Sequence, residues 1–102
     1  MDRKQVITTL RSHEAELRAA GVLSLSLFGS AARDDAGPDS DVDIAVRLSE
    51  NFSKGGLDYF GHLEELEQRL SQILGCHVDV IEEPTRKERF QKQIDKDRAL
   101  AF

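Results

Sequence analysis

Two alternating apolar segments on either side of a Gly-Ser turn constrain the fold of this chain more than any other feature. Residues 22–28 read Val-Leu-Ser-Leu-Ser-Leu-Phe, a period-two pattern typical of a strand whose leucines all face one covered side. Gly29-Ser30 follows directly. Residues 41–48 alternate again, with an apolar face formed by Val42, Ile44, Val46 and Leu48. The pattern predicts two strands and, after the first, a turn that exposes backbone N–H groups.

Helical spacing predicts elements on both sides of these strands. Asp2–Ala20 forms the first expected helix, which Gly21 ends and whose apolar positions are Val6, Leu10 and Leu17. A polar loop with a Gly37-Pro38 turn separates the two strands. Leu57–Leu74 is the second expected helix, with an apolar stripe of Phe60, Leu63, Leu66, Leu70, Ile73 and Leu74.

A third strand and a last helix complete the predicted fold. Cys76–Ile81 is strand-like, and residues 85–88, Thr-Arg-Lys-Glu, resemble a capping box that opens a helix with apolar positions Phe90, Ile94 and Leu100. The order is α-β-β-α-β-α. We therefore expect an α/β fold, with a small mixed sheet flanked by helices and covered mainly on one face. The pattern alone leaves the strand order open.

Bulk composition narrows the function classes. The 102 residues predict a single domain over residues 1–102, and the net charge of −5 disfavours a protein that holds nucleic acid through Lys and Arg. Cys76 is the one cysteine, which favours a reducing, cytoplasmic location. No apolar run is long enough for a membrane span, so no membrane partner is expected. Because of the acidic charge, direct nucleic-acid binding is not expected either.

Three acidic residues fall on the predicted strands. Asp41 and Asp43 leave the same strand face about 7 Å apart, and Asp79 lies in the third strand. Mg²⁺ takes carboxylates, waters and substrate phosphates as ligands, so the three residues are candidate metal ligands. An Asp-x-Asp pair is also common as a solvated strand start, and that reading stays open. His77 shares a face with Asp79, either at this site or as a partly buried structural histidine.

Two segments together resemble a known family. Residues 28–33 read Phe-Gly-Ser-Ala-Ala-Arg, and residues 40–46 read Ser-Asp-Val-Asp-Ile-Ala-Val. This combination resembles the signature of the nucleotidyltransferase superfamily that includes DNA polymerase beta. The short chain resembles its minimal (MNT-type) branch, which is similar to the antitoxin half of HEPN/MNT toxin–antitoxin pairs.

The resemblance implies a role for each matching residue. Gly29 and Ser30 would cradle the nucleotide triphosphate, and Arg33 would lie near its phosphates. Mg²⁺ would be held by Asp41, Asp43 and Asp79, which would also be the catalytic residues. From the sequence, Arg33 could equally be a surface arginine that pairs with Asp34 or Asp35.

Asp34 is the one departure from this signature. The family commonly has glycine after the arginine, and Asp34 adds negative charge near a phosphate site. It also costs backbone freedom if the position requires φ > 0, although Asp tolerates that conformation better than most residues.

The implied reaction transfers AMP from ATP to a hydroxyl group with release of pyrophosphate. In the antitoxin branch the acceptor is a tyrosine of a partner HEPN ribonuclease toxin, so ATP, Mg²⁺ and an assembly with that toxin are expected. Two alternatives remain: an antitoxin that neutralises its partner by binding alone, and nucleotidyl transfer to a small molecule.

Overall fold

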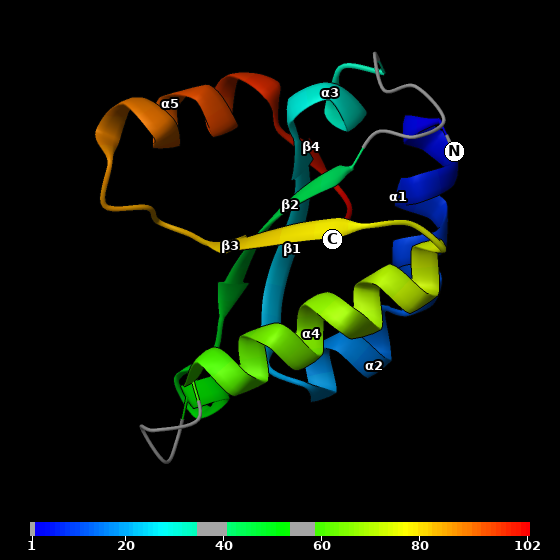
Figure 1. Ribbon diagram of the computed structural model, residues 1–102, viewed down its shortest axis with the longest axis vertical. Coiled ribbons are helices and arrows are strands. Elements are labelled where there is room, and N and C mark those ends of the chain that lie inside the picture. The colour runs from blue at the N-terminus through cyan, green and yellow to red at the C-terminus, as the bar shows by residue number, and fades with distance from the viewer. Residues whose placement is uncertain (1, 35–40, 54–58) are drawn as a thin grey trace.

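A four-stranded mixed sheet forms the centre of the computed structural model, which describes residues 2–34, 41–53 and 59–102 (Figure 1). Its strands are β1 (Val22–Phe28), β2 (Val42–Leu48), β3 (Val78–Glu82) and β4 (Ala99–Leu100), in the order β3-β2-β1-β4. The β1 strand is antiparallel to β2 and β4, whereas β2 and β3 run parallel. This α/β architecture with a small mixed sheet confirms the predicted fold class.

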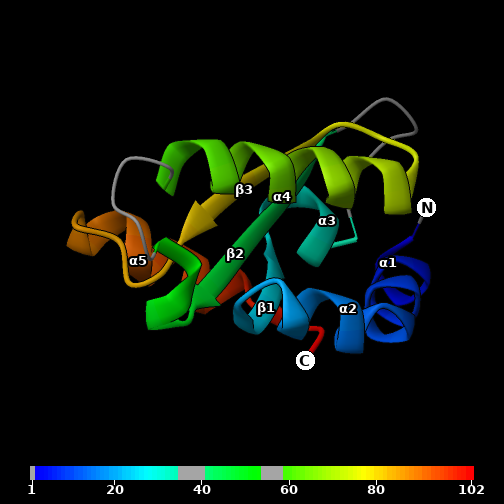
Figure 2. The same cartoon turned by 90° about the horizontal axis from the view of Figure 1, so that it is seen from below.

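Three helices cover one face of the sheet. They are α1 (Arg3–Ser12), α2 (Glu14–Ala19) and α4 (Tyr59–Leu74), and a short 3₁₀ turn, η1 (Glu50–Ser53), precedes α4. Figure 2 shows α4 alongside β3 and α2 next to β1, while α1 packs against α4 and α2. One cluster of buried side chains joins these helices to the sheet: Val6, Leu10, Leu17, Leu25, Leu27, Ile44, Val46, Leu66, Leu70 and Val78. The apolar face predicted for each strand is therefore the core face.

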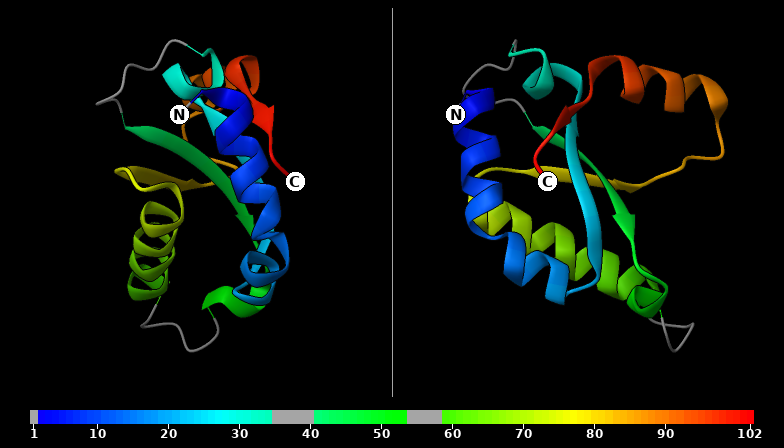
Figure 3. Two further views of the ribbon diagram at one scale, coloured as in Figure 1. Left: turned by 90° about the vertical axis from the view of Figure 1, so that its right-hand side faces the viewer. Right: turned by 180° about the vertical axis from the view of Figure 1, so that it is seen from behind.

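Two further helices lie together at one end of the long strands. They are α3 (Gly29–Ala32) and α5 (Glu88–Asp97), which Figure 3 shows side by side. Ile94 of α5 is fully buried but does not belong to the main core cluster. Because α5 ends directly before β4, the end of the helix is fixed next to β1. Among the described residues, no helix is long and apolar enough to cross a membrane.

Several predicted boundaries are wrong. The expected first helix is two helices, because His13 leaves the helical region at ψ 12°. The last helix begins at Glu88: the Thr85 hydroxyl donates to the Lys87 carbonyl instead of capping the helix. Residues 99–100 form a fourth strand, so the exposed Leu100 belongs to no helix. The Gly37-Pro38 turn and the Leu57 helix start lie outside the described residues.

Four predicted apolar positions are exposed to solvent: Leu23, Phe60, Phe90 and Leu100. Leu23 is 53% exposed, because a register irregularity between Val22 and Ser24 places Val22 in the core and breaks the alternation. Phe60 is 79% exposed at the start of α4, where its ring packs edge-on against Tyr59. Helical spacing assigned Phe60 to the buried stripe, but the buried residues of α4 are Leu66, Leu70 and Leu74.

Candidate functional site

The parallel pairing of β2 with β3 brings the three predicted acids together. Asp43 lies opposite Asp79 in the register, and Asp41 comes two residues earlier on the same face of β2. The side chains of Asp41 and Asp79 are each more than half exposed, at 54% and 52%, while Asp43 is partly buried. The face of the sheet opposite α1, α2 and α4 therefore carries three carboxylates that solvent or a ligand can reach.

Gly29 places the turn after β1 directly against Asp43. Phe28, the last residue of β1, pairs with Asp43, and Gly29 then takes a φ of 69°. A Cβ atom at this position would lie 2.5 Å from Oδ2 of Asp43, far inside van der Waals contact. Only glycine satisfies both the backbone angle and the close approach. The structure thus joins the predicted phosphate turn to the predicted metal ligand.

Burial and the neighbouring carboxylates raise the pKa of Asp43. Removal of its carboxyl group from water is the largest cause, and repulsion by Asp79 and then Asp41 adds to it, while the Arg33 guanidinium acts in the opposite direction. Like charges gathered in this way disfavour the ionised form unless a cation is present. Oxygen-only donors with unbalanced negative charge are what Mg²⁺ or Ca²⁺ require.

His77 also contacts the acidic group. Its Nδ1 lies 3.3 Å from Oδ1 of Asp41 and 3.9 Å from Oδ1 of Asp79. One potential ligand atom from each of Asp41, His77 and Asp79 lies within 4.8 Å of the other two. The side chain of His77 is 62% exposed, so the reading as a partly buried structural histidine is wrong.

Arg33 follows the last residue of α3 and pairs with a distant acid. Its Nη1 lies 2.7 Å from Oδ2 of Asp97, at the end of α5. The sequence offered Asp34 or Asp35 as partners, and Asp35 lies outside the described residues. Asp34 accepts a hydrogen bond from the backbone N–H of Arg3, at 3.0 Å. The φ of Asp34 is 63°, so this position has the left-handed conformation that glycine adopts without strain.

The fold also forms a buried polar network that no sequence pattern predicted. The carboxylate of Glu83 is fully buried and accepts hydrogen bonds from Arg98 and Gln91. Arg98 also donates to the hydroxyl of Ser26 and to Asp95. Neither this network nor the Arg33–Asp97 pair has a sequence signal, because its members are brought together only by the fold.

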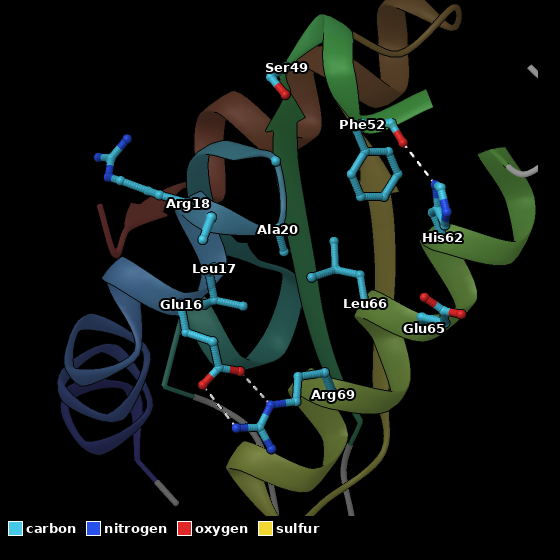
Figure 4. Close-up of a pocket in the computed structure, with 12 residues that line it drawn as sticks. Glu16, Leu17, Arg18, Ala20, Ser49, Phe52, His62, Glu65, Leu66 and Arg69 are labelled. Atoms are coloured by element: carbon cyan, nitrogen blue, oxygen red, sulfur yellow. Dashed lines mark hydrogen bonds and ion pairs between the residues drawn. The ribbon is translucent and has the colours of Figure 1, made fainter. Parts of the chain in front are cut away.

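A separate cavity of about 540 Å³ lies between α2, η1 and α4 (Figure 4). Apolar side chains such as Leu17, Phe52 and Leu66 line it, and an ion pair between Glu16 and Arg69 lies at its edge. His62 is half-buried, and its Nδ1 lies 2.9 Å from the Phe52 carbonyl oxygen. None of the predicted site residues lines this cavity.

Comparisons with known proteins agree with this geometry. Residues 6–101 match the family described as the nucleotidyltransferase domain. The protein adenylyltransferase MntA of Thermococcus cleftensis is 33% identical over 92 residues, which cover 89% of this chain and 87% of that protein.

Solved structures share the fold. One described as a minimal nucleotidyltransferase superposes with a TM-score of 0.74 at 27% identity, covering 97% of this chain and 95% of the other. A crystal structure of a toxin–antitoxin with AMP-PNP gives a TM-score of 0.69 at 20% identity, covering 100% of this chain and 73% of the other. At that identity the likeness concerns the fold alone.

Proposed function

Because this chain belongs to the nucleotidyltransferase domain family, as its match over residues 6–101 shows, we propose that it transfers AMP from ATP to a hydroxyl group of a partner protein. The carboxylate group of Asp41, Asp43 and Asp79 beside the Gly29 turn is the observation that carries the proposal. The nucleotidyltransferase class follows from the family. The acceptor, the metal and the residue roles are the proposal.

The three carboxylates suit Mg²⁺. They offer oxygen ligands from β3, from β2 and from the residue just before β2, and solvent reaches them. The pKa of Asp43 is raised by burial first and then by repulsion from Asp79 and Asp41. Asp41, Asp43 and Asp79 would hold the ion. Bound there, Mg²⁺ would neutralise the triphosphate and the charge that develops in the transition state.

The protein groups have distinct tasks in this proposal. The backbone of the Gly29-Ser30 turn would orient the triphosphate next to Asp43, and Arg33 would add a positive charge nearby. Asp79, more than half exposed, is placed to accept the proton of the attacking hydroxyl. In-line attack on the α-phosphorus then releases pyrophosphate.

We further propose that the acceptor is a tyrosine of a HEPN-type ribonuclease toxin, which makes this chain an antitoxin. The Thermococcus cleftensis relative is named a protein adenylyltransferase, and a structural neighbour is a toxin–antitoxin crystallised with AMP-PNP. Both support a protein acceptor and an adenine nucleotide.

A label-transfer experiment tests the proposal. The protein is incubated with a HEPN-type ribonuclease, Mg²⁺ and ATP labelled at either the α- or the γ-phosphate. Label from the α position alone should enter a tyrosine of the ribonuclease. Label in a small molecule instead would contradict a protein acceptor, and silencing of the ribonuclease without label would favour neutralisation by binding.

Asp79→Ala tests the third carboxylate in the same assay. We expect transfer to be abolished while unfolding stays cooperative, because the exposed side chain of Asp79 contributes little to packing. Glu64→Ala, which removes an exposed acid from α4, is the matched control and should retain full activity. Full activity of Asp79→Ala would remove Asp79 from the site.

A further inference from the structure

The α3 segment cannot orient Arg33 on its own. It contains four residues, a single turn, and isolated helices of this length are not stable in water. The Arg33 backbone N–H donates to the Gly29 carbonyl at 3.2 Å, which fixes the backbone of Arg33 relative to the turn but leaves a long, half-exposed side chain. Some other group must set the direction of the guanidinium.

Asp97 is one group that does so. Its side chain is 6% exposed, and its Oδ2 accepts both from Arg33, at 2.7 Å, and from Gln93 Nε2, at 3.0 Å. Both donors hold the pKa of Asp97 below its ordinary value, with Gln93 the larger cause. An acid at the last residue of a helix opposes the helix dipole, so helix stability alone does not explain Asp97.

The residue after Asp97 anchors this end of α5. Arg98 donates to the buried carboxylate of Glu83 at 2.9 Å and to the Ser26 hydroxyl of β1 at 3.0 Å. The backbone on the C-terminal side of Asp97 is thereby held against the sheet. Asp97 is therefore an acceptor in a fixed place, 2.7 Å from the Arg33 guanidinium.

The backbone keeps the Arg33 charge near the carboxylates. The Arg33 N–H donates to the carbonyl of Gly29, the residue that lies directly against the Asp43 side chain. A guanidinium presents its five N–H donors in one rigid plane, so holding one nitrogen sets the direction of all of them. This arrangement suits recognition of a phosphate group.

We propose that Asp97 is a positioning residue, which holds the Arg33 guanidinium in the orientation that binds the phosphates of the nucleotide. The inference rests on the proposed function, since it assigns a residue of α5 to the same nucleotide site. It makes α5 part of that site, although α5 contributes none of the three carboxylates.

A double-mutant cycle tests this role. Binding of the α,β-methylene analogue of ATP, which cannot transfer AMP, is measured by calorimetry in Mg²⁺ for wild type, Asp97→Asn, Arg33→Lys and the double variant. Because charge-assisted hydrogen bonds to phosphate are strong and directional, each single change should weaken binding about tenfold. The double variant should bind no more weakly than the weaker single variant.

Glu88→Gln is the matched control, because it removes one negative charge from α5 at an exposed position paired only with Lys92 among the described contacts. It should bind within about twofold of wild type. Arg33→Lys keeps the charge at a half-exposed position, so it reports on orientation even if Asp97→Asn folds poorly. Thermal midpoints are measured for every variant.

The outcomes separate the two proposals. If wild type binds the analogue but Asp97→Asn matches Glu88→Gln, or if the two single effects multiply in the double variant, Asp97 does not position Arg33. Wild-type affinity in Arg33→Lys also overturns the inference, because the guanidinium plane would then be irrelevant. If wild type binds no analogue, the proposed function fails, and the inference that depends on it fails too.

Discussion

The same face of the sheet holds two groups of carboxylates with opposite electrostatic environments. Around Arg98, the buried Glu83 and its neighbour Asp95 have their charges balanced by hydrogen bonds, which lower both pKa values. Around Asp43, three carboxylates lie together, and burial followed by repulsion from Asp79 and Asp41 raises the pKa of Asp43. The first group stabilises the fold. The second opposes it, which is the arrangement expected where a protein is built to receive a cation.

Removing the acids of the second group should have the largest effect on function. In Asp41→Asn/Asp43→Asn, we expect transfer to fall at least about 10³-fold, because the metal ligands that stabilise transition-state charge are lost. Mg²⁺-dependent ATP binding in calorimetry should disappear as well. Mg²⁺ should raise the melting temperature of wild type but leave that of the variant unchanged.

The stability of the fold should change in the opposite direction from activity. Without metal, the double variant should be at least as stable as wild type, since it relieves like-charge repulsion.

Toxin neutralisation by the double variant at wild-type efficiency would contradict a catalytic antitoxin. It would favour the alternative that binds without transferring AMP.

Breaking the first group should have the largest effect on stability. Arg98→Ala leaves the Glu83 carboxylate buried without its main donor, and loss of one partner of a buried pair costs about 3 kcal/mol. Urea unfolding measures the loss. Replacement of both residues, as Glu83→Gln/Arg98→Met, should cost less than Arg98→Ala because no charge is stranded. A loss below about 1 kcal/mol for Arg98→Ala would mean that solvent already reaches the pair.

The two groups should also give opposite pH dependences of unfolding in metal-free buffer. The pKa of Glu83 is lowered in the folded state, so its stabilisation is present above its unfolded pKa near 4.5 and is lost as the pH falls through the folded pKa. The pKa of Asp43 is raised, so its ionisation reduces stability as the pH rises above 3.8.

Two conservative variants isolate these contributions. As the pH rises from acid towards neutral, Asp43→Asn should gain stability relative to wild type, whereas Glu83→Gln should lose it. Denaturant midpoints at a series of pH values measure both trends. Parallel trends in the two variants would show that the contrast between the groups is wrong.

The sequence predicted the second group better than the first, for a physical reason. Asp41 and Asp43 are separated by one strand repeat, and Gly29 marks a backbone angle, so local rules identify them. Asp79 required the assumption that its strand pairs with β2, which the register confirms. The roles of these residues remain predictions.

The contacts of Arg98 and Asp97 could not be predicted in the same way. Arg98 bonds to Ser26, 72 residues earlier, and Asp97 pairs with Arg33, 64 residues earlier. Such pairs depend on where α5 packs, and no local period encodes that. The same limit explains β4, whose two residues are too few to show alternation and form a strand only because β1 offers an open edge.

Asp34 belongs to neither group of acids, and its replacement should have the smallest effect. Its exposed carboxylate has a described partner in the Arg3 backbone N–H, away from the three acids, and its φ of 63° favours glycine. Asp34→Gly loses that hydrogen bond but relieves the backbone strain, so stability should change by no more than about 0.5 kcal/mol. ATP affinity in calorimetry should stay within about twofold of wild type. A large loss of affinity would mean that Asp34 acts on the nucleotide as a fourth acid of the second group. Unchanged affinity would limit that group to Asp41, Asp43 and Asp79.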